Sequence, residues 1–164
     1  MSSSDLCRRC GLCCDGNLFS HVPLERAEVD AARRQGLVVL ELPGQGPALR
    51  QGCAALHDRQ CSVYDARPLG CRRYGCQLLA ALEQKALPLE DALAVVEQAH
   101  SLLAEVEREL EPDPDPAASV LERARFASWG GDAETTARTT AARERAEAFL
   151  DQHFHGGPRR FEVL

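Results

Sequence analysis

The sequence predicts a mainly α-helical fold, in which a small, irregular cysteine-rich module is followed by a helical hairpin or bundle. Aromatic residues make up only 5% of the 164 residues, while alanine and leucine are frequent, and this balance favours helices packed through small side chains. All eight cysteines lie in the first half of the chain, and the clearest helical periodicity lies in the second. We therefore divide the chain into residues 1–80 and 81–164, and expect the two parts to pack as one compact unit.

The first half is expected to form short elements. In residues 21–36, HVPLERAEVDAARRQG, apolar residues recur on one side, Pro23 fits a first helical turn and Gly36 fits a helix end, which predicts a short helix. Residues 37–42, LVVLEL, predict a strand before the turn-forming GQGP. A further helical pattern appears from Arg67 onward, around residues 72–86, RRYGCQLLAALEQKA.

The second half predicts helices separated by a stiff connector. The first helix is opened by Pro88 and carries an apolar seam whose members step by three and four: Leu89, Ala92, Val96, Ala99, Leu103, Val106 and Leu110. Alternate prolines exclude residues 112–116, PDPDP, from a helix interior. Residues 118–130 predict a short helix that ends at Gly130 and Gly131, and residues 132–154 a longer one.

Two local features of these helices can be predicted as well. Asp132 is placed to cap the last helix. Phe126, Trp129 and Phe149 are expected to pack against the apolar seam, which we expect to be internal core.

Composition excludes several classes of protein. The net charge of −6 and the absence of a long Lys/Arg run argue against nucleic acid as a partner. No run of about 18 apolar residues could span a bilayer, and the N-terminus does not resemble a secretory signal. We therefore expect a soluble, cytoplasmic protein without a membrane partner, and in a reducing compartment clustered cysteines favour metal ligation or redox chemistry over disulfides.

The cysteine spacing predicts metal ligation. In CRRC, two thiols are separated by two residues, a spacing whose turn lets both sulfurs reach one tetrahedral metal, and Gly11 supplies a flexible backbone for that turn. Cys13 adds a third thiol at the same interval, as at the start of a ferredoxin cluster run, but the fourth ferredoxin cysteine is missing and Cys14 follows instead. Neighbouring side chains usually point apart, so Cys13 and Cys14 are expected to serve different centres, or one bridging and one terminal position.

The number of thiols would satisfy two four-thiolate sites, so more than one metal centre is expected to fit. Zinc and iron, including a 4Fe-4S cluster, are both compatible with an all-sulfur ligand set. With so many thiols, neither His21 nor His57 is required as a ligand, and both are expected at the surface or in loops. Four arginines stand beside ligand candidates and either lower thiol pKa values or are ordinary solvated residues: Arg8, Arg9, Arg72 and Arg73.

Taken together, CRRCGLCC and CAALHDRQCSVYDARPLGCRRY resemble the CxxCxxCC family, also called the YkgJ family, of zinc- or iron-chelating proteins. CSVYDARPLGCR is similar to the family's pattern C-x-(V/I)-Y-(D/E)-x-R-P-x-x-C-R, and the resemblance runs roughly from Cys7 to Cys76. It implies that the metal ligands are Cys7, Cys10, Cys13, Cys14, Cys53, Cys61 and Cys71. We add Cys76 to this set, although Gly75 precedes it where the family often has proline.

Three further residues belong to the same motif. Pro68 is expected to stiffen the turn before Cys71. Arg67 is expected to hold Asp65 or a carbonyl that faces the site, and Tyr64 to shield the site from water. The alternative is that all three only build the loop.

Three functions remain open from the sequence. The first is a cytoplasmic metal-binding protein whose clustered cysteines chelate zinc or an iron–sulfur cluster. The second is an accessory or catalytic component of a protein- or peptide-modifying system, because the CxxCxxCC block also occurs in proteins linked to flagellin lysine methylation; no glycine-rich nucleotide loop or nucleophile elbow is visible. The third is a metal-folded interaction module that contacts a protein partner through its C-terminal helices. The sequence leaves open whether the chain is an enzyme.

Overall fold

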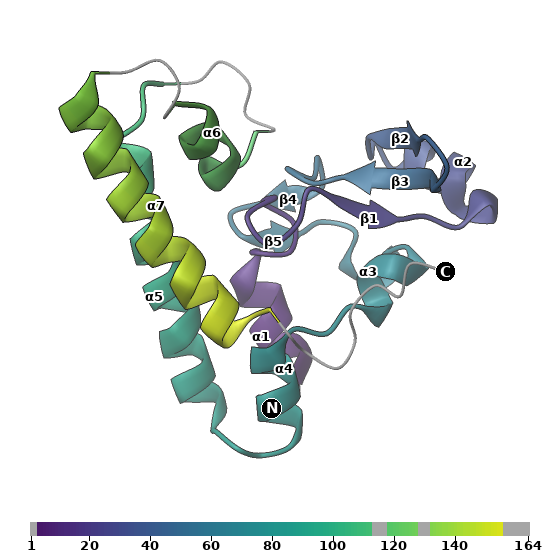
Figure 1. Cartoon of the computed structure of the whole chain (residues 1–164). Coiled ribbons are helices and arrows are strands. Elements are labelled where there is room, and N and C mark those ends of the chain that lie inside the picture. Colours follow the sequence, from purple (N-terminus) through teal and green to yellow (C-terminus); the bar gives the residue numbers. More distant parts are fainter. Residues whose placement is uncertain (1–2, 113–117, 128–131, 156–164) are drawn as a thin grey trace.

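The fold is mainly α-helical, as predicted, with small sheets confined to the first half of the chain (Figure 1). The computed structural model describes residues 3–112, 118–127 and 132–155. Within them it contains α1 (Ser3–Cys10), α2 (Val29–Arg34), α3 (Leu69–Arg73), α4 (Gln77–Glu83), α5 (Leu89–Arg108), α6 (Val120–Ala127) and α7 (Ala133–His153), with two single-turn 3-10 helices, η1 (Arg26–Glu28) and η2 (Tyr64–Ala66).

Two small antiparallel sheets organise the first half. The larger has the order β1-β3-β2, and pairs Val22 of β1 and Val39 of β2 with Leu49 of the central strand. The smaller is a two-stranded hairpin, β4-β5. The strands are β1 (His21–Pro23), β2 (Val39–Leu42), β3 (Gly46–Arg50), β4 (Leu56–His57) and β5 (Gln60–Cys61).

The helix predicted over residues 21–36 starts later than expected. His21–Pro23 is a strand, and the helical part comprises only η1 and α2. Burial explains the difference, because Val22 and Leu24 are buried while Pro23 between them is exposed, which is the alternation of a strand. Pro23 lies on an edge strand, where its missing N–H costs no ladder hydrogen bond.

The strand predicted over residues 37–42 is confirmed as β2, and the turn after it is present. The central strand β3 was not predicted, because Gly46 and Pro47 at its start look like turn residues. Ala48 and Leu49 are nevertheless buried, and they pair with strands on both sides. The helical pattern predicted over residues 72–86 is split into α3 and α4.

The helical hairpin is confirmed. α5 and α7 run antiparallel along each other, with α6 beside their upper end (Figure 1). The centre of the predicted seam is buried, namely Ala92, Val96, Ala99, Leu103 and Val106. Asp132 caps α7 as predicted, because its carboxylate accepts hydrogen bonds from the backbone N–H groups of Glu134 and Thr135 at 3.0 Å each.

The aromatic packing was predicted only in part. Phe149 packs against the core of the helices, but Phe126 is 61% exposed, so its predicted role in the core is wrong. Phe126 follows the buried Ala124 by two positions, which turns it away from the face that α6 buries. Trp129, the end of the helix at Gly130 and Gly131, and most of the proline connector lie outside the described residues.

Buried side chains form two cores. The helical core joins α1, α4, α5, α6 and α7, and includes Leu6, Leu12 and Phe154. The sheet core lies between the larger sheet and α2, and includes Val22 and Leu49. Partly buried Phe19, in the segment between α1 and β1, packs against both cores.

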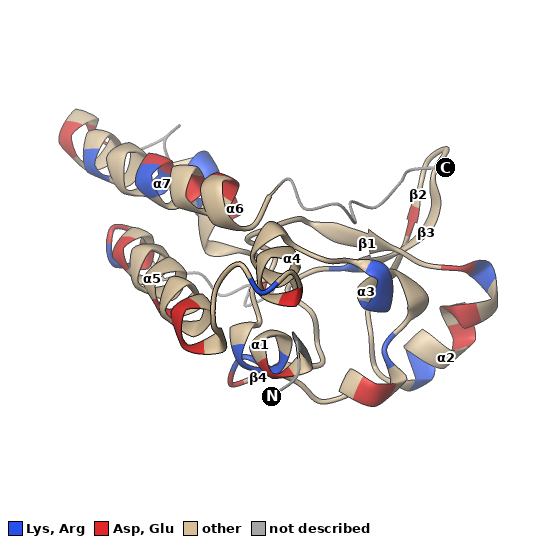
Figure 2. Cartoon of the chain, turned by 90° about the horizontal axis from the view of Figure 1, so that it is seen from below, with Lys and Arg blue, Asp and Glu red and all other residues tan. Residues whose placement is uncertain are grey.

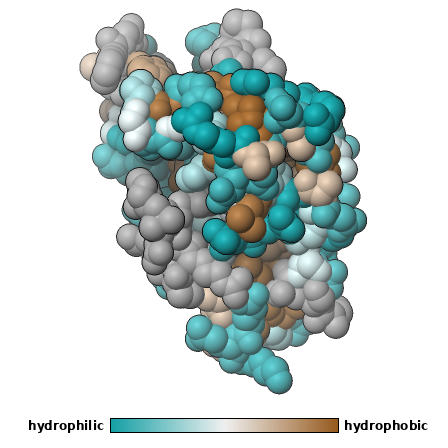
Figure 3. All heavy atoms as spheres, turned by 90° about the vertical axis from the view of Figure 1, so that its right-hand side faces the viewer, coloured by the Kyte–Doolittle hydropathy of each residue, from teal (hydrophilic) through white to brown (hydrophobic). Residues whose placement is uncertain are grey.

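The surface is polar and mixed in charge. Basic and acidic residues are interspersed along α2 and α7 (Figure 2), and some pair across helices, as Arg145 of α7 does with Glu105 of α5 at 3.3 Å. On the side shown in Figure 3, hydrophobic residues form separated patches among hydrophilic ones. Within the described residues, none of the helices combines the length and apolar character needed to cross a bilayer.

The backbone of the cysteine-rich turn lies unusually close to the β4-β5 hairpin, and this contact is testable. Gly11 and Gly36 have nearly equal positive φ values, 72° and 77°. A Cβ at Gly11 would lie 3.0 Å from Cα and the carbonyl oxygen of Arg59, whereas one at Gly36 would meet nothing within 4 Å. We predict that Gly36→Ala lowers the free energy of unfolding by about 1 kcal/mol through backbone strain, and Gly11→Ala by at least about 1 kcal/mol more.

Urea denaturation of the two variants and the wild type would measure both effects. Because the backbone strain is matched, the difference between the variants reports the approach of the hairpin to Gly11. Equal losses in the two variants would contradict the described packing.

Candidate metal centre

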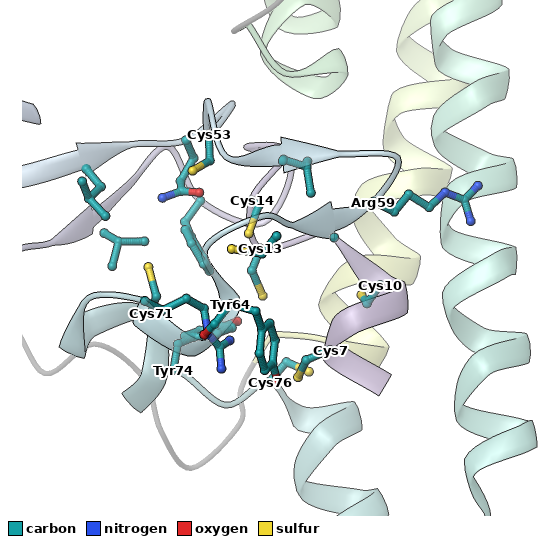
Figure 4. A pocket seen from close by; sticks show the side chains of 18 of the residues that line it. Cys7, Cys10, Cys13, Cys14, Cys53, Arg59, Tyr64, Cys71, Tyr74 and Cys76 are labelled. Atoms are coloured by element: carbon teal, nitrogen blue, oxygen red, sulfur yellow. The ribbon is translucent and has the colours of Figure 1, made fainter. Parts of the chain in front are cut away.

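All eight cysteines border one cavity, which we call the thiol cavity. It has a volume of about 80 Å³ and lies between α1, the turn that follows it, the β4-β5 hairpin and the segment from η2 to α4 (Figure 4). None of the eight forms a disulfide. They are Cys7, Cys10, Cys13, Cys14, Cys53, Cys61, Cys71 and Cys76.

The N-terminal motif is built from a helix and a turn. Cys7 and Cys10 are three positions apart in α1, which places them on one face of the helix. The expectation that CRRC itself forms a turn is therefore wrong. The turn begins at Gly11, whose carbonyl accepts hydrogen bonds from the N–H groups of Cys14 at 2.8 Å and Asp15 at 3.1 Å. This turn brings Cys13 back towards the helix.

Four cysteines interact with one another at the helical side of the cavity. We call Cys7, Cys10, Cys13 and Cys76 the first thiol group. A charge on Cys76 raises the pKa of each of the other three. All four belong to, or pack against, the helical core. The Sγ of Cys76 accepts a hydrogen bond from the N–H of Leu79 at 3.3 Å, which fixes this thiol at the start of α4.

The other four cysteines interact at the sheet side. We call Cys14, Cys53, Cys61 and Cys71 the second thiol group. Charges on the last three raise the pKa of Cys14, and charges on Cys53 and Cys61 raise that of Cys71. Cys53, Cys61 and Cys71 pack against the sheet core. The N–H of Cys53 donates to the carbonyl of Cys14 at 2.7 Å, which ties the N-terminal turn to this group.

The adjacent residues Cys13 and Cys14 therefore belong to different thiol groups, while both face the same cavity (Figure 4). Cys14 interacts with the three cysteines of the sheet side. Cys13 interacts with all three other members of the first group and with its neighbour. Two consecutive side chains thus join the two groups.

The donor set fits a thiophilic metal, although the thiols do not meet at a point. Each group offers four sulfur donors, the ligand set of zinc sites and of iron–sulfur clusters. Within the described residues, however, no three Cys, His, Asp or Glu side chains converge closely enough to hold a single ion. The sulfurs surround a space instead.

Burial controls the protonation of these thiols. It raises the pKa of Cys7 from the ordinary 9.0 to about 11, and that of Cys10 and Cys71 to about 12. The pKa values of Cys13 and Cys14 are also raised well above the ordinary value, chiefly by burial and then by neighbouring thiols. At neutral pH these five thiols are protonated in the metal-free protein, so a metal that they ligate must displace protons as it binds.

One arginine acts on both thiol groups, and it is not one of the four singled out in the sequence. Arg67 lowers the pKa of Cys7 and of Cys71 against the larger effect of burial. One expectation was that Arg67 holds Asp65, and this is wrong. Its Nε instead donates to the carbonyl of Tyr64 at 2.9 Å. The four arginines beside the cysteines, Arg8, Arg9, Arg72 and Arg73, are exposed, which fits the solvated alternative.

The histidines singled out in the sequence lie away from the thiols. His21 is half-buried in β1, with its Nδ1 3.1 Å from Oγ of Ser20, so its expected surface or loop position is wrong. His57 is exposed on β4, at the surface as expected, and neither histidine borders the thiol cavity. Asp15 lies beside the thiols, and burial raises its pKa to about 6.

A third histidine that the sequence did not single out supports the site. The Nε2 of His100 in α5 donates to the carbonyl of Cys10 at 2.7 Å. One turn earlier on the same helix, Glu97 pairs with Arg59 at the tip of the β4-β5 hairpin at 3.0 Å. α5 thus holds both the N-terminal turn and the hairpin. In the sequence, the only indication of this role is that His100 directly follows Ala99, a residue of the apolar seam.

The raised thiol pKa values predict how the metal-free protein responds to alkali. Below about pH 9 the thiols are neutral in both the folded and the unfolded chain, so the free energy of unfolding keeps its full value there. As the pH rises towards the folded values of about 11 and 12, unfolded thiols ionise first and stability is lost. We predict that the urea midpoint of reduced, metal-free protein falls steadily above about pH 9.

The double variant Cys7→Ser/Cys10→Ser serves as the control, because it removes two of the raised thiols and should show a shallower decline. A midpoint independent of pH over this range would contradict the burial of the thiols.

Comparison with known proteins agrees with the site. The model of the CxxCxxCC family, described as a putative zinc- or iron-chelating domain, matches residues 6–91, which is more than half of the chain. No curated protein and no solved structure matches the chain. Because the family match runs through every cysteine that borders the thiol cavity, this chain belongs to the CxxCxxCC family.

Proposed function

We propose that this chain is a metal-binding protein with two centres, each held by four thiolates. The first thiol group forms one centre, and the second thiol group forms the other. The observation that carries the proposal is the division of the cysteines into two sets of four, in which adjacent Cys13 and Cys14 are the point of contact.

Two independent features support this division. The electrostatic interactions among the thiols separate the groups, with Cys13 and Cys14 as the link between them. The packing separates them too, because the first group belongs to or packs against the helical core, while Cys53, Cys61 and Cys71 of the second pack against the sheet core. Four thiolates complete the coordination of a tetrahedral ion or of a four-iron cluster.

The spacing of the thiols supports iron–sulfur clusters over single zinc ions. Four sulfurs about 2.3 Å from one zinc ion must crowd around a point. Four sulfurs around a four-iron cluster stand further apart, because the metal and sulfide atoms lie between them. The described thiols border a cavity without converging on one point, which supports a cluster rather than a single ion in the proposed centres.

Two further points concern the location of the protein and its partners. Eight thiols kept free for metal suit a reducing compartment, so we propose a cytoplasmic location. The alternative in which the seam of α5 binds a protein partner loses its basis, because the seam residues are buried in the helical core.

Metal analysis of paired variants tests the two-centre proposal. Anaerobically purified wild type should contain about eight iron and eight sulfide per chain, and show a brown colour with visible absorption. Cys7→Ser/Cys10→Ser should remove one centre, and Cys53→Ser/Cys71→Ser the other, so each variant should keep about half of the metal. The two variants act as controls for each other.

Different results would overturn different parts of the proposal. If either pair removes all of the metal from a folded chain, the two centres are not independent. If the wild type is colourless and holds two equivalents of zinc, the clusters are wrong but the two centres stand.

A further inference from the structure

Arg67 borders the thiol cavity, which both thiol groups also border. It is half-buried, and it precedes Pro68, from which α3 leads to Cys71 of the second thiol group. Figure 4 shows Tyr64 and Cys71 on the same side of the cavity, with Cys7 and Cys76 beyond Tyr64. Among the cations described, Arg67 is the one that lowers the pKa of a thiol in each group, Cys7 and Cys71.

The position of Arg67 is fixed by Tyr64. The centre of its guanidinium lies 3.5 Å from the centroid of the Tyr64 ring, within the range of a cation–π contact, and its Nε donates to the Tyr64 carbonyl at 2.9 Å. These two contacts use one face and one nitrogen of the guanidinium. The terminal nitrogens make no ion pair with any carboxylate of the described residues, so the positive charge is not neutralised there.

Other arginines around the cavity are neutralised. Arg59 pairs with Glu97 at 3.0 Å. Arg8 also contacts the Tyr64 ring, with its guanidinium carbon 4.1 Å from the centroid, but it pairs with Asp65 at 2.9 Å. Arg67 therefore differs from them in carrying an unpaired charge into a space bordered by thiols.

We propose that Arg67 is the shared counter-cation of both metal centres, held in place by Tyr64. This inference rests on the two-centre function proposed above. Four thiolates around a dication, or around a cluster of charge 2+, leave each centre with two excess negative charges, and a nearby fixed cation stabilises both loaded centres at once. Arg67 is thus a positioning and specificity residue that favours the loading of anionic thiolate complexes.

Two acidic residues act on one thiol group each and provide a contrast, whereas Asp15 raises the pKa of a thiol in each group, Cys10 and Cys14. Glu83 raises the pKa of Cys7 and Cys76, both in the first thiol group. Glu28 raises the pKa of Cys71 in the second thiol group. A substitution at Glu83 should therefore affect one centre, whereas a substitution at Arg67 should affect both.

Cadmium binding to the full-length chain tests this inference, because Cd²⁺ forms four-thiolate complexes that absorb in the ultraviolet, whichever metal the protein holds in the cell. Affinity is measured by competition with a chelator in two backgrounds, Cys53→Ser/Cys71→Ser and Cys7→Ser/Cys10→Ser, each of which keeps one centre. Arg67→Gln should weaken cadmium binding about tenfold in both backgrounds, and Arg67→Lys should weaken it less. Arg8→Gln, the matched control, should change neither affinity.

Variants at Glu83 and Tyr64 test the same inference without changing Arg67. Glu83→Gln should tighten binding only where the first thiol group is intact. Tyr64→Ala should reproduce part of the Arg67→Gln effect at both centres, and Tyr64→Phe should resemble wild type, so these variants replace Arg67→Gln if that variant does not fold.

The outcomes separate the inference from the proposed function. If Arg67→Gln weakens only one centre, or weakens binding no more than Arg8→Gln, the shared counter-cation is refuted while two centres stand. If a background variant binds no cadmium although it is folded, the two-centre function fails. The effect of Arg67→Gln is then read in the chain with all eight cysteines, where no loss of affinity would refute the role of Arg67 as well.

Discussion

The structure depends on one short constraint, the peptide bond between Cys13 and Cys14. These residues cannot separate by more than about 3.8 Å at their Cα atoms, yet their side chains serve different thiol groups and those groups belong to different cores. The sheet and the helices must therefore meet at this bond. The Gly11 turn before it and the hydrogen bond from Cys53 to Cys14 after it hold the junction in place.

Burial protects the thiols when no metal is bound, but it also opposes metal binding. Apolar surroundings keep the thiols neutral and hence poor nucleophiles, which protects them when no metal is bound. The same surroundings oppose the charge that metal ligation would create, so thiolates in this cavity would need compensation from backbone N–H groups and cations. Leu79 supplies such a hydrogen bond to Cys76, and Arg67 supplies the charge that acts on both groups.

Periodicity and spacing predicted the features that depend on local sequence. The α5 seam and the Asp132 cap follow from helical steps and capping chemistry. Three features could not be predicted, because they depend on contacts between distant residues: strand β3, which begins with turn-like Gly46 and Pro47; the effective cation, Arg67, which is distant in sequence from Cys7; and His100, which reaches Cys10 across 90 positions.

The link from His100 to Cys10 has a consequence for synthesis on the ribosome. The second thiol group is complete once residue 71 has emerged, and its sheet core needs nothing beyond the first half of the chain. The first group is complete at Cys76, but its shelter requires α5 and then Leu150 and Phe154. Because a chain folds from its N-terminus as it is made, the thiols of the first group stay open to oxidants and foreign metals until the chain has been made as far as Phe154.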